Sequence, residues 1–139
     1  MNNITYRMNE GKISIPENWR DDSMQVFVVP DDSGVNLVIN RTPVPVGLDC
    51  EAYYAETLEQ FQNSLPGFKE LARNQIPLDG AQAQTLEYRW KSPEGEMHQY
   101  VVMQVRQALL LTFTVTSPNA LAESQRDYFQ QIIQSFSAE

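Results

Sequence analysis

Two neighbouring segments of this chain carry apolar side chains on both faces of a predicted strand. They span residues 24–29 and 35–40, and the turn sequence Asp31-Asp32-Ser33-Gly34 between them predicts a hairpin. Successive residues of a strand point to opposite faces of its sheet. A sheet that is covered by helices on one face only would leave half of these apolar side chains exposed to water.

The alternation divides the apolar side chains of this hairpin into two sets. The set predicted to fill the core comprises Phe27, Val29, Leu37 and Ile39. The set that points the other way comprises Met24, Val26, Val28 and Val38. The second set has no evident cover within the chain, so it is a candidate binding surface.

The rest of the first half predicts two short strands and a helix. The strands are expected at residues 4–8 and 12–15. Asp49 is a suitable N-cap for a helix that runs to about Ser64, because apolar side chains recur there at helical spacing. Pro66-Gly67 should end that helix.

The second half predicts an antiparallel meander followed by a helix. Short turns separate four alternating segments, and these are residues 68–76, 81–90, 97–105 and 109–116. Ser117 and Pro118 then have the N-cap and first-turn chemistry that opens a helix.

These elements indicate the fold class. We expect a single α+β domain over residues 1–139, since a chain of this length builds one core. The domain is predicted to hold a mainly antiparallel, twisted sheet with its two main helices packed on one face. The other face of the sheet would be concave and partly apolar.

Charge and composition restrict the partners. The net charge is −8, and the ten Lys and Arg residues are scattered, which argues against nucleic acid and anionic membranes. No run approaches the roughly 18 apolar residues of a membrane span, and the N-terminus lacks a signal-peptide pattern. We therefore expect a cytoplasmic protein that does not insert into membranes. The single cysteine, Cys50, fits a reducing compartment and is predicted to be a half-buried helix residue.

The inventory of catalytic residues is small. His98 is the one histidine, and its place within a predicted strand favours a surface residue. The acidic pairs lie in predicted turns without the spacing of a calcium loop. We therefore expect neither an enzyme nor a bound metal or cofactor. Uncharged glutamines on a strand could instead satisfy polar groups of a bound chain, and Gln25 and Gln99 are the candidates.

Several segments together resemble a known family. They are Ile15-Pro16-Glu17-Asn18-Trp19, the strand at 24–29, Asn36-Leu37-Val38-Ile39-Asn40-Arg41, Leu65-Pro66-Gly67-Phe68 and Leu86-Glu87-Tyr88-Arg89-Trp90. In order and spacing they are similar to the DcrB-like family, and within it to the Eag chaperones that accompany type VI secretion effectors. The resemblance extends over nearly the whole chain.

The resemblance implies a homodimeric chaperone. Members of this group bind the N-terminal transmembrane helices of effectors that carry a PAAR domain, and they keep those helices soluble until loading on the secretion spike, which is a further possible partner. The client-facing strand positions of the family fall on Met24, Val26 and Val38, with Val28 and Leu110 as weaker members. A strand-borne glutamine of the family matches Gln99, and one on the first helix falls on Thr57, one turn from Gln60.

Two other interpretations stay open from the residues alone. In the first, the second apolar face is buried in a homodimer and the protein binds no client. In the second, a small enzyme or ligand-binding domain uses a pocket under Trp90 and Tyr100, with polar groups converging on His98.

Overall fold

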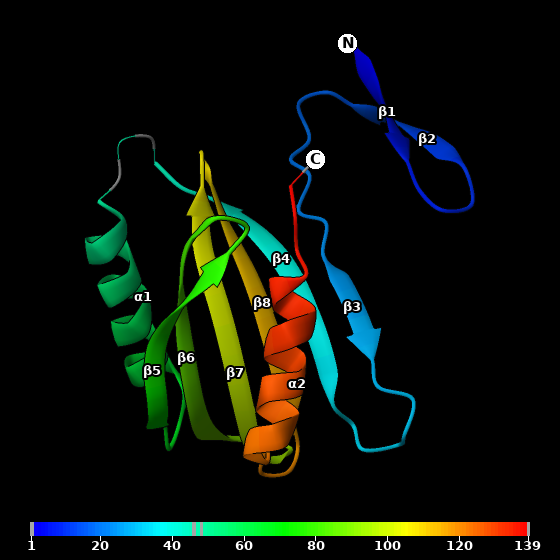
Figure 1. Cartoon of the computed structure of the whole chain (residues 1–139). Coiled ribbons are helices and arrows are strands. Elements are labelled where there is room, and N and C mark those ends of the chain that lie inside the picture. The colour runs from blue at the N-terminus through cyan, green and yellow to red at the C-terminus, as the bar shows by residue number, and fades with distance from the viewer. Residues whose placement is uncertain (1, 46, 48, 139) are drawn as a thin grey trace.

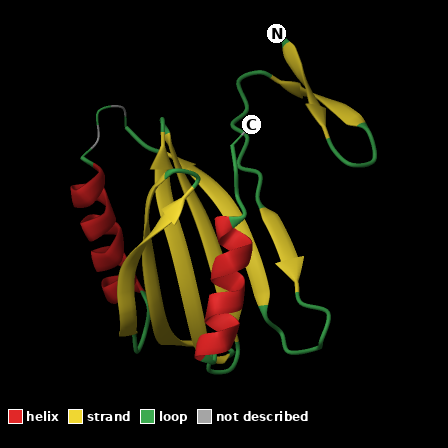
Figure 2. Ribbon diagram, in the orientation of Figure 1, coloured by secondary structure: helices red, strands yellow, loops and turns green. Residues whose placement is uncertain are grey.

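The computed structural model describes residues 2–45, 47 and 49–138, so Met1 and Glu139 at the two ends of the predicted domain lie outside the described residues. Helices pack against a broad antiparallel sheet, and a separate hairpin projects from this sheet at the N-terminal end of the chain (Figures 1 and 2). The elements follow one another in this order: β1 (Asn3–Arg7), β2 (Lys12–Pro16), β3 (Gln25–Val28), β4 (Asn36–Pro43), α1 (Cys50–Ser64), β5 (Lys69–Leu78), β6 (Ala81–Ser92), β7 (Gly95–Arg106), β8 (Leu109–Ser117) and α2 (Glu123–Gln134). The α+β class and the antiparallel sheet are confirmed.

The main sheet has six strands in the order β3-β4-β8-β7-β6-β5. Strands β5 to β8 form the predicted meander, and each pairs antiparallel with the next. The turn between β5 and β6 uses Asp79 and Gly80 at φ 50° and 80°, the left-handed conformations that a tight hairpin turn of this type requires. Strand β4 joins beside β8, so the β3–β4 hairpin forms one edge of the sheet.

Helix α1 begins and ends where local sequence predicts. One carboxylate oxygen of Asp49 accepts hydrogen bonds from the backbone N–H groups of Glu51 and Ala52, at 3.1 and 3.4 Å. These bonds satisfy donors that have no partner within the helix. At the other end, Gly67 adopts φ 65°, the left-handed conformation that favours glycine after a helix.

The two helices lie on opposite faces of the sheet, so their expected placement on one face is wrong. Val101 of β7 packs in a cluster with Leu58 of α1, whereas its neighbour Val102 packs in a second cluster with Phe129 of α2. Because neighbouring strand residues point to opposite faces, the two clusters are separate cores. The apolar run of β7 is thus buried on both sides, and a second helix is needed to cover the second side.

Helix α2 begins later than predicted. Ser117 is the buried last residue of β8, and the helix starts only at Glu123 with Ala122 as its N-cap. Ala122 has no side-chain acceptor, but its backbone N–H donates to the side-chain Oε1 of Gln125 at 2.9 Å. The intervening segment is held in place by the burial of Leu121, a tertiary contact that local sequence does not reveal.

Neither helix covers the whole sheet. Figure 1 places α1 beside β5 and β6, at the end of the sheet away from β3. On the face of the sheet that α1 covers, the half formed by β3, β4 and most of β8 is therefore left without a helix.

The N-cap gives a direct test of how α1 is held. Replacing Asp49 by Ala should lower the free energy of unfolding by about 1 kcal/mol, because two N–H groups lose their acceptor. Urea unfolding at a fixed protein concentration measures the change. Asp49→Asn keeps an accepting oxygen and is the control, and an equal loss in both variants would contradict the assignment.

Candidate functional site

The predicted binding surface lies on the uncovered half of the sheet. In the register of β3 with β4, Val26 pairs with Val38, and Val38 in turn pairs with Thr114 of β8. Thr114 has the same strand parity as Leu110, which packs in the α1 cluster, so these side chains share the face of α1. Val26 is 55% exposed. Met24 and Val28 are also exposed, as the alternation predicted, whereas Val38 is partly buried.

We name this surface the open face. Its apolar members are Met24, Val26, Val28 and Val38. A row of threonines on β8 continues it toward α1, and this row comprises Thr112, Thr114 and Thr116. The open face is therefore apolar at the sheet edge and hydroxyl-lined further in.

Leu110 does not belong to the exposed part of this face. It is 6% exposed and packs with Val44 and Leu58 in the α1 cluster. Leu110 was expected to contact a client, and this expectation is wrong. Its side chain belongs to the core, because α1 covers this end of β8.

Gln99 joins the open face to the part of the sheet that α1 covers. Its side-chain oxygen accepts from the Tyr88 hydroxyl at 2.7 Å and from the Trp90 indole N–H at 2.8 Å, while its nitrogen donates to the Thr116 hydroxyl at 2.9 Å. Burial raises the pKa of Tyr88, which keeps its hydroxyl protonated as a donor. The amide nitrogen carries a second N–H, so Gln99 can fix its neighbours and still donate to a bound chain.

The other two glutamines lie elsewhere. Gln25 pairs with Ile39, which points toward α2, and its oxygen accepts from the Arg41 guanidinium. Gln25 is therefore on the face opposite to Val26. Its predicted place on the client surface is wrong, because neighbouring residues of a strand point to opposite faces. Gln60 is exposed on α1.

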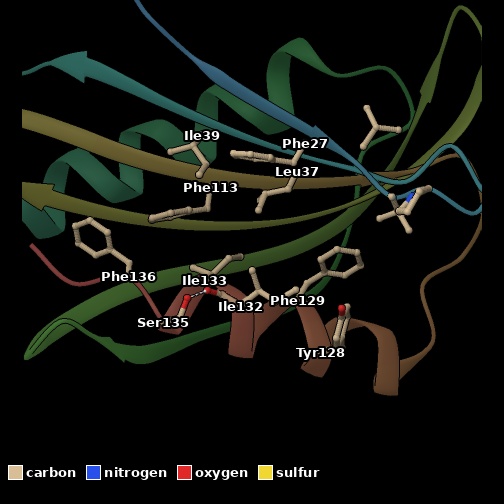
Figure 3. A pocket seen from close by; sticks show the side chains of 13 residues that line it. Phe27, Leu37, Ile39, Phe113, Tyr128, Phe129, Ile132, Ile133, Ser135 and Phe136 are labelled. Atoms are coloured by element: carbon tan, nitrogen blue, oxygen red, sulfur yellow. Dashed lines mark hydrogen bonds between the residues drawn. The ribbon is translucent and has the colours of Figure 1, made fainter. Parts of the chain in front are cut away.

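A second apolar surface, which the sequence did not predict, lies between the sheet edge and α2. It is a groove of about 480 Å³, and Figure 3 shows apolar side chains of β3, β4 and α2 pointing toward one another across it. The side chains that line it on the two sides include Phe27, Leu37 and Ile39 opposite Tyr128, Ile132 and Phe136.

Phe27 in this groove was expected in the core, and that expectation is wrong. Its side chain is 56% exposed, whereas Leu37 is buried and Val29 and Ile39 pack partly against the core. β3 is a four-residue edge strand that α2 does not cover, so the side chain of Phe27 stays exposed. The signal available in the sequence was the second row of apolar residues on the last helix, Tyr128 and Ile132, which lie beside the buried Phe129 and Ile133.

A buried polar network lies under the start of α2. His98 is 4% exposed, so its expected surface position is wrong. The backbone N–H of Leu121 donates to His98 Nδ1 at 2.9 Å, which leaves Nε2 to carry the proton and to donate to Glu87 at 2.6 Å. Arg126 of α2 donates to the other oxygen of Glu87 at 3.1 Å, and this hydrogen bond raises the pKa of Arg126.

This network satisfies its own members. Polar groups do converge on His98, but both ring nitrogens are already occupied by Leu121 and Glu87. Trp90 and Tyr100, which were expected to frame one pocket, pack in the two separate clusters on opposite faces of the sheet. The arrangement thus fixes the start of α2 to β6 and β7 and leaves His98 no lone pair for a substrate.

Other features of the described part of the chain bear on function. Among these residues no group of three His, Cys, Asp or Glu side chains is placed to hold a metal ion. No helix that the structure describes has the length and apolarity to cross a bilayer. Cys50 is the exposed first residue of α1, so its expected half-buried position is wrong.

The fold and the site together define a small α+β protein whose sheet leaves apolar side chains open on both faces at one edge. The family model described as DcrB matches residues 10–135, and the chain belongs to this family. A curated relative from Pseudomonas aeruginosa, named Effector EagT6, is 33% identical over 118 residues, which are 81% of this chain and 81% of that protein. The resemblance to Eag proteins within the DcrB-like family is confirmed.

A solved structure shares the fold. It is a crystal structure from Pseudomonas aeruginosa described as a protein of unknown function, PA94. It is 26% identical in sequence and superposes with a TM-score of 0.81 over 100% of this chain and 99% of its own. The fold as a whole is therefore found in a related protein.

The buried network predicts a large loss of stability when its centre is removed. Glu87→Ala should lower the free energy of unfolding by about 3 kcal/mol, because Arg126 and His98 lose their shared acceptor in a buried site. Hydrogen exchange should show faster opening of the start of α2. The control is Glu70→Ala, which removes an exposed ion pair with Arg73 and should cost less than about 1 kcal/mol. Equal losses in the two variants would contradict this role.

Proposed function

We propose that this protein is a cytoplasmic, non-enzymatic chaperone of the type VI secretion system. It binds the apolar N-terminal transmembrane helices of a PAAR-domain effector and shields them from water until the effector is loaded on the secretion spike, a second partner in this proposal. The observation that carries the proposal is the open face, an apolar surface that α1 leaves uncovered in an otherwise polar and acidic chain. The match to a relative named as an Eag protein supports the same conclusion.

The chemistry of the open face suits an apolar helix. A helix lying along β3 and β4 would cover Met24, Val26 and Val38 and would remove their side chains from water. The threonines of β8 and the second N–H of Gln99 offer hydrogen bonds to polar atoms that such a helix carries. The exposed Gln60 on α1 could add a polar contact from the other side.

The size of the open face favours a dimer. Three of its four apolar side chains are more than half exposed and Val38 is partly buried, so covering them contributes roughly 3 to 6 kcal/mol. Association and ordering cost about 4 to 15 kcal/mol, so the open face of one protomer binds weakly at best. In a homodimer, once one open face has bound the client, the second open face would meet the same client at a high effective concentration. We therefore include the homodimer in the proposal.

A structural homodimer without a client is the alternative function. It would bury the open face against a second copy, which explains the apolar edge equally well. The position of Gln99 speaks against it, since a spare amide donor beside an apolar surface is costly to bury without a partner. Binding of a hydrophobic dye separates the two, because a face buried between copies would leave little dye bound.

A charge on the open face should abolish client binding. Val26→Asp places a carboxylate where the client helix would pack, and desolvating that carboxylate opposes binding. The fold should survive because Val26 is exposed. The measurement is co-expression with the N-terminal apolar segment of a PAAR-domain effector encoded beside this protein, and the amount of soluble effector is the readout.

The matched control is Leu71→Asp, which places the same charge on an exposed apolar residue of β5, at the other end of the sheet. We expect the control to keep the effector soluble and Val26→Asp to lose it. The proposal fails if Val26→Asp protects the effector as well as the unaltered protein does, or if the effector stays soluble without any chaperone.

A further inference from the structure

The N-terminal β1–β2 hairpin has one apolar and one polar face. In its register Ile4 pairs with Ile15 and Tyr6 pairs with Ile13, so these four side chains share a face. The intervening residues, among them Thr5 and Ser14, form the other face. Ile4 and Ile13 are 47% and 50% exposed. The apolar face of such a hairpin is suited to packing on an apolar surface. Its own chain leaves Ile4 and Ile13 on this face exposed.

The hairpin stands apart from the main sheet. It forms a separate two-stranded sheet, and Figure 1 shows it beyond the end of the sheet from which β3 begins. The Tyr6 hydroxyl bonds to the Ser23 hydroxyl at 3.0 Å, which ties the hairpin to the connecting segment that leads into β3. An isolated two-stranded hairpin is marginally stable in water, so this one needs a surface on which to pack.

The chain exposes more surface than a compact monomer of its mass. It exposes 9362 Å². A compact monomer of this mass exposes about 7,300 Å². The excess of about 2,000 Å² per chain is of the size that stable homodimers bury.

The groove beside α2 matches the apolar face of the hairpin. It is lined by apolar side chains, and Phe27 and Val28 of β3 form part of that lining. The side chains that line the groove carry no formal charge, so its contact with the hairpin would be apolar. The apolar face of the hairpin therefore fits an apolar groove.

We propose that each copy of this chain seats the apolar face of its β1–β2 hairpin in the α2 groove of a second copy. The inference rests on the homodimer of the proposed function and assigns its interface. The second copy is the occupant because the hairpin lies away from its own sheet (Figure 1), and because the surface in excess of a compact monomer is of the size that stable homodimers bury. The open face on the other side of the sheet then stays free for the client.

Single cysteines on two differently tagged chains test this exchange. Both chains carry Cys50→Ser, which removes the exposed native thiol. One chain also carries Ile13→Cys on the hairpin, and the other carries Ile132→Cys on α2. After co-expression and treatment with a short bismaleimide, we expect a band at the mass of two chains that contains both tags. The matched control replaces Ile13→Cys by Ser14→Cys on the polar face of the hairpin, and it should give no such band.

Each other outcome overturns the inference in a recognisable way. A monomer by light scattering would remove the homodimer, and with it both the interface and that part of the proposed function. A dimer without the two-tag band would reject the exchange and leave the chaperone proposal standing. A cross-link within one chain that carries both cysteines would show docking in its own groove. Loss of the two-tag band on adding the effector's apolar segment, with the dimer intact, would assign the groove to the client.

Discussion

The burial of β7 on both of its faces is the constraint on which the rest of the structure depends. Val101, Val102 and Met103 follow one another in this strand, and all three are almost completely buried. A strand of this kind needs a core on each side. The chain has one helix of sufficient length for each core, and neither extends over a sheet of six strands. The edge formed by β3 and β4 is therefore left open on both faces.

Two adjacent residues of the same strand organise the two sides. His98 points toward α2 and fixes its start through Leu121 and Glu87. Gln99 points the other way and holds Tyr88 and Trp90 under α1 through hydrogen bonds to its oxygen. Polar residues in a core restrict it to one arrangement when all their partners are present. These two residues thus set the positions of the surfaces that border the open edge.

The sequence predicted what depends on local chemistry. The cap at Asp49, the glycine turns, the meander and the exposed set around Val26 all follow from spacing and residue type within a few positions. It did not predict which face α2 covers, because periodicity tells which residues share a face but not which helix lies on it. His98 was misplaced for the same reason, since its partners Glu87 and Leu121 lie 11 and 23 residues away. Phe27 was misplaced because its burial depends on how far α2 reaches over an edge strand, whereas Gln25 was misplaced although alternation with Val26 already puts it on the other face.

The two open surfaces differ in their chemistry, and the two proposals give them different partners. The groove beside α2 is apolar, concave and lined by large side chains of fixed geometry, which suits one partner that is always the same, such as a hairpin encoded in the same chain. The open face combines aliphatic side chains with threonines and a glutamine, so under the proposed function it offers an apolar helix both van der Waals contacts and hydrogen bonds. A chaperone needs a constant interface for its own assembly and an adaptable one for its client. An edge hairpin with apolar side chains on both faces supplies both from a single pair of strands.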